Sequence, residues 1–201
     1  MIAPLVVWQR GEADFLLLTE PEFGEVVRAH LERMRVAAKC EILLEEHTST
    51  VVFGEADGIP NRDYGVAAVE QIDAGVNAEP ADEELERLRI LACTPRWGRE
   101  IDEGILPAEA GLDARAVSFT KGCYPGQEPL ARLHARGHAN RALRVLDVHG
   151  EAVRPGTEIR HGERVVGRVT SAVPGLALGY VRTDMPDDGT LEVAGRLARI
   201  H

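Results

Sequence analysis

The sequence predicts an α+β fold in which an antiparallel sheet with helices is followed by a small antiparallel β-barrel. Residues 1–80 alternate short apolar runs with one amphipathic helical segment, in a strand–helix–strand–strand–strand order. That order is typical of helices packed on one face of an antiparallel sheet. From Ala142 onward, short alternating runs are separated by glycine and proline, which is typical of a small barrel.

In the N-terminal part, Thr19 is the expected N-cap of the helix, with Glu22 at the capping-box position. Apolar residues at helical spacing then give this helix one buried face: Phe23, Val27, Leu31 and Met34. Apolar and β-branched runs predict the strands, which are residues 14–19, 41–46, 48–54 and 65–72.

A polar, proline-bearing stretch at 77–83 predicts a crossing between modules. A second helix is expected over 82–92, ending before Pro95, and a short helix near 107–112. Gly126 opens a further helix that runs through Leu133. We therefore expect three regions, which are residues 1–80, 81–139 and 140–201.

Composition excludes several classes of protein. Of the 201 residues, 44% are hydrophobic and 28% charged, which is ordinary for a globular chain. A net charge of −10 argues against general nucleic-acid binding. No membrane span or secretory signal is evident, so we expect a cytoplasmic protein that does not bind membranes. Three cysteines without a CxxC pair argue against a disulfide framework.

Charge is distributed unevenly along this acidic chain. The segment 121–144 holds five basic residues and one acid, Glu128, which gives it a net charge of +4. A local basic patch of this size suits a small anionic ligand better than a long polyanion. Lys121 belongs to it, although 21 of the 23 basic residues are arginine.

Cys123 lies two residues after Lys121, and a nearby cation favours the reactive thiolate form of a cysteine. A half-buried structural cysteine explains the same spacing equally well. Cys123, His134 and His138 form a C-x10-H-x3-H set, yet no fourth ligand is evident, so we expect no stably bound metal.

Glu109 lies in the apolar, turn-like stretch LPAEAGL. Its carboxylate is suited to accept two N–H donors from a heterocycle. An acid favoured by a helix N-terminus is the alternative, and the residues alone leave both open.

The motifs of the central region occur in a fixed order: LRILACTPRWGREID, LPAEAGL, VSFTKGCYPGQE, ARLHARGHANRAL and VVGRVTSAV. Together they resemble the YgfZ-type branch of the glycine-cleavage T-protein superfamily, the tetrahydrofolate-binding proteins that support iron–sulfur enzymes. The signature K-G-C-Y-x-G-Q-E matches at residues 121–128. The resemblance covers nearly the whole chain and is weaker in residues 1–80.

The resemblance implies a three-lobed protein with a central folate channel: a ferredoxin-like lobe, a first lobe and a C-terminal barrel. Because the similarity starts at the entry to the second lobe, we expect the N-terminal segment to be absent and the first lobe to be partial. Two positions depart from the family pattern, since Cys93 stands where glycine is usual and Pro129 follows the signature directly.

The same resemblance implies the site. Cys123 and Lys121 would carry the chemistry and face the channel, and Glu109 would lie near the pterin. The other residues expected to bind the folate are Tyr124, Gly126, Gln127, Glu128, Arg132 and Arg136.

Three functions follow as hypotheses. The first is a tetrahydrofolate-binding accessory protein for iron–sulfur cluster assembly or repair, with Cys123 as its functional thiol and iron–sulfur enzymes or assembly proteins as partners. The second is a tetrahydrofolate-dependent aminomethyltransferase. That branch reads K-G-D-Y-x-G-R-E, with a carboxylate in the place of Cys123 and an arginine in the place of Gln127. The third is a thiol or metal module that binds no folate.

Overall fold

The computed structural model describes residues 3–75, 82–137, 139–185 and 189–201. Its internal contacts divide the chain into two units. The N-terminal unit comprises Met1–Arg62 and Val66–Glu79, and the C-terminal unit comprises Asp63–Gly65 and Pro80–His201.

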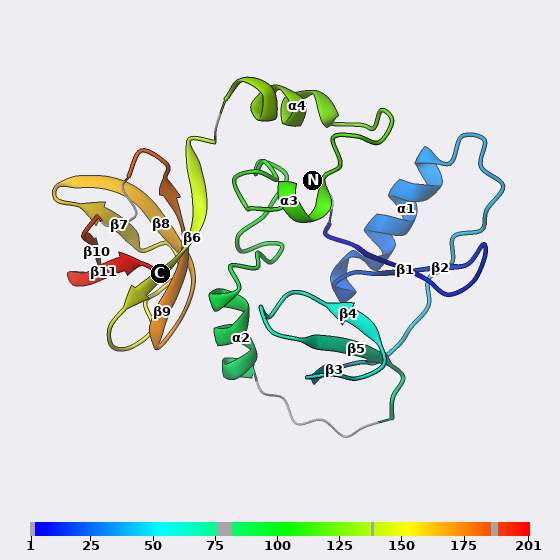
Figure 1. Ribbon diagram of the computed structural model, residues 1–201, viewed down its shortest axis with the longest axis horizontal. Coiled ribbons are helices and arrows are strands. Elements are labelled where there is room, and N and C mark those ends of the chain that lie inside the picture. Colours follow the sequence, from blue (N-terminus) through cyan, green and yellow to red (C-terminus); the bar gives the residue numbers. More distant parts are fainter. Residues whose placement is uncertain (1–2, 76–81, 138, 186–188) are drawn as a thin grey trace. The chain divides into compact units, whose positions relative to one another are not determined.

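Within its described residues, the N-terminal unit contains two small antiparallel sheets, one α-helix and one short 3-10 helix (Figure 1). A two-stranded ribbon pairs β1 with β2, and a three-stranded sheet has the order β3-β5-β4. The elements are β1 (Val6–Gln9), β2 (Phe15–Leu18), the short 3-10 helix η1 (Pro21–Phe23), α1 (Gly24–Met34), β3 (Ser49–Phe53), β4 (Ile59–Asn61) and β5 (Ala68–Ile72). Among the described residues of this unit, the buried apolar side chains are those of Val27, Ile59 and Ala68.

Three of the expected N-terminal strands are confirmed as β2, β3 and β5. The strand expected over 41–46 is wrong, because this stretch pairs with no strand among the described residues and exposes Leu43 and Leu44. Strands β1 and β4 were not predicted. β4 contains Pro60, which a strand tolerates here because β4 lies at the edge of its sheet.

Thr19 does not cap the first helix as expected. Its hydroxyl instead donates a hydrogen bond of 3.1 Å to the carbonyl of Pro4. The helical segment begins with η1, whose N-cap is Glu20, and no described side chain caps this end with a hydrogen bond. The hydroxyl therefore ties the chain before β1 to the chain after β2.

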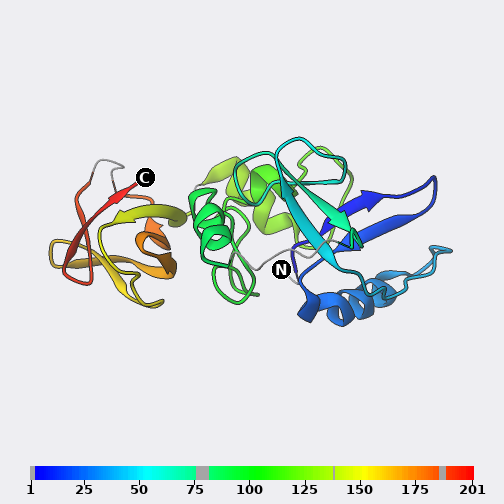
Figure 2. The ribbon, with the colours of Figure 1, turned by 90° about the horizontal axis from the view of Figure 1, so that it is seen from below.

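The C-terminal unit contains a closed six-stranded barrel with helices beside it (Figures 1 and 2). Around the barrel the strands follow the order β10-β11-β6-β9-β8-β7. This confirms the predicted fold class. The elements are α2 (Asp82–Leu91), α3 (Asp113–Ala116), α4 (Gln127–Arg136), β6 (Arg141–Val148), β7 (Glu158–His161), β8 (Arg164–Val173), β9 (Gly175–Arg182), β10 (Leu191–Val193) and β11 (Arg196–Ile200).

The helix expected near 107–112 is replaced by turns, with Glu109 N–H bonded to the Leu106 carbonyl and Leu112 N–H to that of Pro107. Gly111 has φ +68°, a left-handed conformation that interrupts a right-handed helix. A helix, α3, begins only at Asp113. The helices expected over 82–92 and from Gly126 are confirmed as α2 and α4.

Two apolar layers hold the C-terminal unit together. The first fills the barrel, with Leu146, Ile159 and Val193 at its centre. The second lies on the outer face of β6 and β9, where Leu143, Leu178 and Tyr180 pack against Ile90 of α2. Strand β9 is buried on both faces, which explains its nearly continuous apolar sequence GLALGYV. The barrel and α2 thus share a core.

Candidate functional site

The signature forms a loop that leads into α4. Within residues 118–126, which we call the thiol loop, Lys121 N–H bonds the Ser118 hydroxyl at 3.2 Å. Tyr124 N–H donates to Gln127 Oε1 at 3.1 Å. Gly126 adopts φ +81° directly before the helix, a turn that glycine makes without steric strain. These contacts explain why glycine and glutamine occupy their places in the signature.

Cys123 is exposed on the thiol loop. The Lys121 ammonium lies 4.8 Å from the centroid of the Tyr124 ring, which is cation–π distance. Phe119 stacks on His134 of α4, with ring centroids 4.0 Å apart and planes 17° from parallel. The loop is therefore held at both ends, and an accessible thiol, an ammonium and aromatic faces occur within a few residues of one another.

Cys93 contrasts with Cys123. It is half-buried, and its thiol donates to the Leu143 carbonyl at 3.6 Å. Burial raises the pKa of the Cys93 thiol. Cys93 has φ +53°, a left-handed conformation that glycine adopts without steric strain and other residues adopt rarely. Of these two cysteines, Cys93 is the one in a structural setting.

The remaining predicted residues of the signature region lie on α4. Glu128 and Arg132 form an ion pair of 2.8 Å one helical turn apart, and their side chains are 82% and 70% exposed. A pair this exposed contributes little to stability. Both side chains are accessible to a ligand. Arg136 is the last residue of α4, and its side chain lies outside the described part of the structure.

Glu109 is held by the first strand of the barrel. Its side chain is 12% exposed, and Arg141 contacts both carboxylate oxygens, Nε to Oε1 at 2.9 Å and Nη2 to Oε2 at 3.2 Å. Leu106 N–H donates to Oε2 at 3.3 Å. The hydrogen bond to Glu109 raises the pKa of Arg141. The helix-terminus interpretation of Glu109 is wrong, because residues 107–112 form turns.

The predicted residues therefore fall into two groups. Contacts within residues 118–136 connect the thiol loop to α4, while the contacts of Glu109 lead to β6. The pairing of Glu109 with Arg141 was not predicted. Arg141 is one of the five basic residues of the segment 121–144, and a separation of 32 residues leaves no local pattern to reveal its partner. The Phe119–His134 stack was missed for the same reason.

The C-x10-H-x3-H set is only partly described, since His138 lies outside the described residues. Within the described part of the chain, no three His, Cys, Asp or Glu side chains are arranged to hold a metal ion. The structure thus offers no described cluster on which a metal function can be argued.

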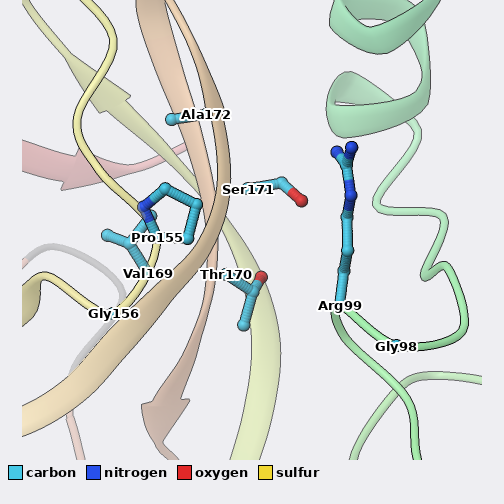
Figure 3. Close-up of a pocket in the computed structure, with 8 residues that line it drawn as sticks. All are labelled: Gly98, Arg99, Pro155, Gly156, Val169, Thr170, Ser171 and Ala172. Carbon is cyan, nitrogen blue, oxygen red and sulfur yellow. The ribbon is translucent and has the colours of Figure 1, made fainter.

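A shallow cleft of about 400 Å³ lies elsewhere in the C-terminal unit. The turn at Gly98 and Arg99 forms one wall, and β8 with Pro155 and Gly156 forms the other. Figure 3 shows Thr170 and Ser171 of β8 on the side of this opening that faces the turn with Arg99. None of the residues predicted from the signature lines the cleft.

Comparisons with known proteins agree with this architecture. Residues 140–201 match the family described as the CAF17 C-terminal beta-barrel domain. The chain is 32% identical over 116 residues to an Arabidopsis thaliana protein named as a chloroplastic transferase, covering 55% of this chain and 26% of the relative. It is 33% identical over 95 residues to an aminomethyltransferase of Corynebacterium aurimucosum, covering 47% of this chain and 25% of that one.

A third relative is an uncharacterized protein of Haemophilus influenzae, which is 29% identical over 174 residues and aligns over 80% of this chain and 62% of its own. The chain thus spans about a quarter of the first two relatives and less than two thirds of the third. The comparisons support the superfamily of the aminomethyltransferases and CAF17, without selecting the YgfZ type. No helix in the described part of the chain is both long and apolar enough to cross a membrane.

Proposed function

We propose that this chain binds tetrahydrofolate and serves as an accessory protein for iron–sulfur cluster assembly or repair, with Cys123 as its functional thiol. The superfamily comparisons support a fold of this kind. The observation that carries the proposal is the Glu109 carboxylate, which is mostly buried yet retains acceptor capacity.

A carboxylate has about four lone-pair positions for hydrogen bonds. Three are taken on Glu109, two by Arg141 and one by the Leu106 N–H. The carboxylate can thus accept one more donor, and a second if the 3.3 Å bond from Leu106 opens. A reduced pterin presents neighbouring N–H donors on one edge, so its heterocycle suits this carboxylate.

Charge supports an anionic ligand. The glutamate tail of a folate carries two carboxylates, and the segment 121–144 has a net charge of +4. Arg132 is 70% exposed, and its partner Glu128 is 82% exposed, so a ligand carboxylate can compete for its guanidinium. Tyr124, Gly126 and Gln127 would then shape the loop that carries Cys123.

Cys123 favours the accessory function over the transferase. The transferase signature has an aspartate at this place, and a thiol there exchanges a fixed charge for a soft, redox-active ligand. The thiol is exposed, with the Lys121 ammonium two residues away. Such a group suits sulfur or iron chemistry better than transfer of an amine.

Isothermal titration calorimetry with 5-formyltetrahydrofolate, a reduced folate, tests the ligand. We expect a measurable heat for the wild-type chain and at least about tenfold weaker binding for Glu109→Gln. Glu103→Gln, which changes an exposed acid of the same region, is the matched control and should bind as the wild type does. No heat for a chain shown by circular dichroism to be folded would refute the proposal.

Complementation tests the thiol. In cells that lack the endogenous protein, Cys123→Ala should fold normally but fail to restore the activity of iron–sulfur enzymes. Cys40→Ala, which removes the other exposed thiol, should restore it. Full restoration by Cys123→Ala would rule out the functional thiol.

A second candidate is a tetrahydrofolate-dependent aminomethyltransferase, which the relative of that name favours. Incubation with an aminomethyl-lipoyl carrier and tetrahydrofolate separates the two functions. Formation of a one-carbon adduct of tetrahydrofolate would select the transferase. Folate binding without such transfer would select the accessory protein.

A further inference from the structure

We infer that Arg141 is a positioning residue, which holds the Glu109 carboxylate in the orientation that receives the ligand. This inference rests on the proposed folate site. It adds a role for the barrel, because Arg141 is the first residue of β6.

The contact has the geometry of a positioning pair. The guanidinium meets both carboxylate oxygens, at 2.9 and 3.2 Å, and such a two-point contact fixes rotation as well as distance. A single ammonium would leave the carboxylate free to turn. The Leu106 N–H donates a further hydrogen bond to Oε2, one of the two oxygens that Arg141 contacts.

Arg141 is itself held in place. Its guanidinium carbon lies 5.0 Å from the centroid of the Tyr180 ring, within the range of a cation–π contact. Tyr180 is buried, and its hydroxyl donates to the Glu100 carbonyl at 2.8 Å. The support for Glu109 therefore continues into the shared core of α2 and the barrel.

The main chain adds a second link between the same elements. Leu143 N–H of β6 donates to the Glu109 carbonyl at 2.8 Å. Both the backbone and the side chain of Glu109 are thus bound by residues at the start of β6, Leu143 and Arg141. A site carried by a strand in this way is more precise than a site on a free loop.

Arg182 supplies an internal comparison, because it lies directly opposite Arg141 in the β6–β9 register. Arg182 pairs with Asp184, two residues further along the chain, and both side chains are about half exposed. Arg141 reaches across 32 positions to a carboxylate that is 12% exposed. These two neighbouring arginines of one sheet thus bind different carboxylates, so Arg182 is a matched control for Arg141.

Calorimetric titration with 5-formyltetrahydrofolate of the wild type, Arg141→Ala, Arg141→Lys and Arg182→Ala tests the inference. Arg141→Ala should weaken binding by about tenfold or more, and Arg182→Ala should leave it unchanged. The affinity of Arg141→Lys should fall between those of the wild type and Arg141→Ala, since lysine keeps the charge but loses the two-point contact with the carboxylate. Millimolar guanidinium ion should partly restore binding to Arg141→Ala, which repair of a purely structural defect would not do.

The outcomes distinguish a failure of the folate site from a failure of the role given to Arg141. No binding by the wild type overturns the folate site and this inference together. Binding by the wild type with an unchanged dissociation constant for Arg141→Ala overturns the inference alone. Equal losses for Arg141→Ala and Arg182→Ala, or no restoration by guanidinium ion, also overturn it, because the effect would then lie in the barrel as a whole. Wild-type affinity in Arg141→Lys would show that the positive charge suffices and would overturn positioning by the two-point contact.

Discussion

The Ser171 hydroxyl donates a hydrogen bond of 2.6 Å to Oε1 of Glu100, which lies 71 positions earlier in the chain. Both residues are buried, each with 2% of its surface exposed. The other carboxylate oxygen of Glu100 accepts from Arg89 Nη1 at 3.1 Å and from the Arg96 N–H at 2.9 Å. Three elements of the C-terminal unit thus converge on one buried carboxylate, so Glu100 links these elements.

Glu100→Gln should destabilise the C-terminal unit by about 3 kcal/mol, because it leaves the buried Arg89 partly uncompensated and turns an amide N–H₂ toward a donor. Urea unfolding followed by circular dichroism measures this change. Glu103→Gln, at an exposed position, is the control and should change stability by less than about 0.5 kcal/mol. Similar midpoints for both variants would contradict the role given to Glu100.

His47 should make the stability of the N-terminal unit depend on pH. Its Nε2 lies 2.8 Å from Glu45 and its Nδ1 2.7 Å from Asp73, so both ring nitrogens can donate only in the protonated form. The hydrogen bond to Glu45 raises the pKa of His47 above its ordinary 6.5. Hydrogen bonds from Arg10 and then His47 lower the pKa of Glu45 to about 2.

The signs of these shifts define the pH window. The raised pKa of His47 stabilises fully below 6.5, and this contribution is lost as pH rises through the folded value. The lowered pKa of Glu45 stabilises above 4.5, and that contribution is lost as pH falls toward about 2. The thermal midpoint of the N-terminal unit should therefore be highest between pH 4.5 and pH 6.5. His47→Gln should remove the fall on the alkaline side, whereas His30→Gln, which replaces a histidine bonded to Arg33, should keep it.

Gly167→Ala should destabilise the barrel by about 1–3 kcal/mol or more, because a Cβ at this position would overlap the backbone carbonyl of Tyr180 on β9. Neither strand can move without disturbing the closed barrel. Gly122→Ala is the control, since its Cβ would meet nothing within 4 Å. Thermal unfolding measures the difference, and equal midpoints would show that the strands separate more easily than the structure indicates.

The three cysteines should alkylate in a defined order, with Cys123 fastest, Cys40 second and Cys93 slowest. Cys123 and Cys40 are exposed, and Lys121 lies two positions before Cys123 in the sequence. Cys93 is half-buried, and burial raises its pKa. A time course with iodoacetamide, read by peptide mass spectrometry, gives the three rates. Lys121→Gln should slow Cys123 toward Cys40, and a wild-type Cys123 no faster than Cys40 would refute the activated thiol.

Sequence patterns predicted those elements whose residues show a regular apolar spacing bounded by turn residues. The barrel was predictable because alternating apolar residues and regular turn residues leave few other ways to bury one face of each strand. The strand expected over 41–46 does not form, because a run such as EILLEE becomes a strand only if a partner supplies hydrogen bonds, and no strand in the described part of the chain pairs with it. Thr19 does not act as the expected N-cap, because its hydroxyl donates instead to the carbonyl of Pro4, 15 positions away.

The sequence by itself determined that a glycine-bounded loop carries Cys123 and Lys121, and that a barrel follows it. Glycine conformations and alternating burial depend on neighbours within a few residues, so they can be read along the chain. Only the tertiary structure decided that Glu109 is held by Arg141 and that α2 packs on the outside of the barrel. Those contacts join residues tens of positions apart, and chain folding, rather than any local pattern, brings them within reach.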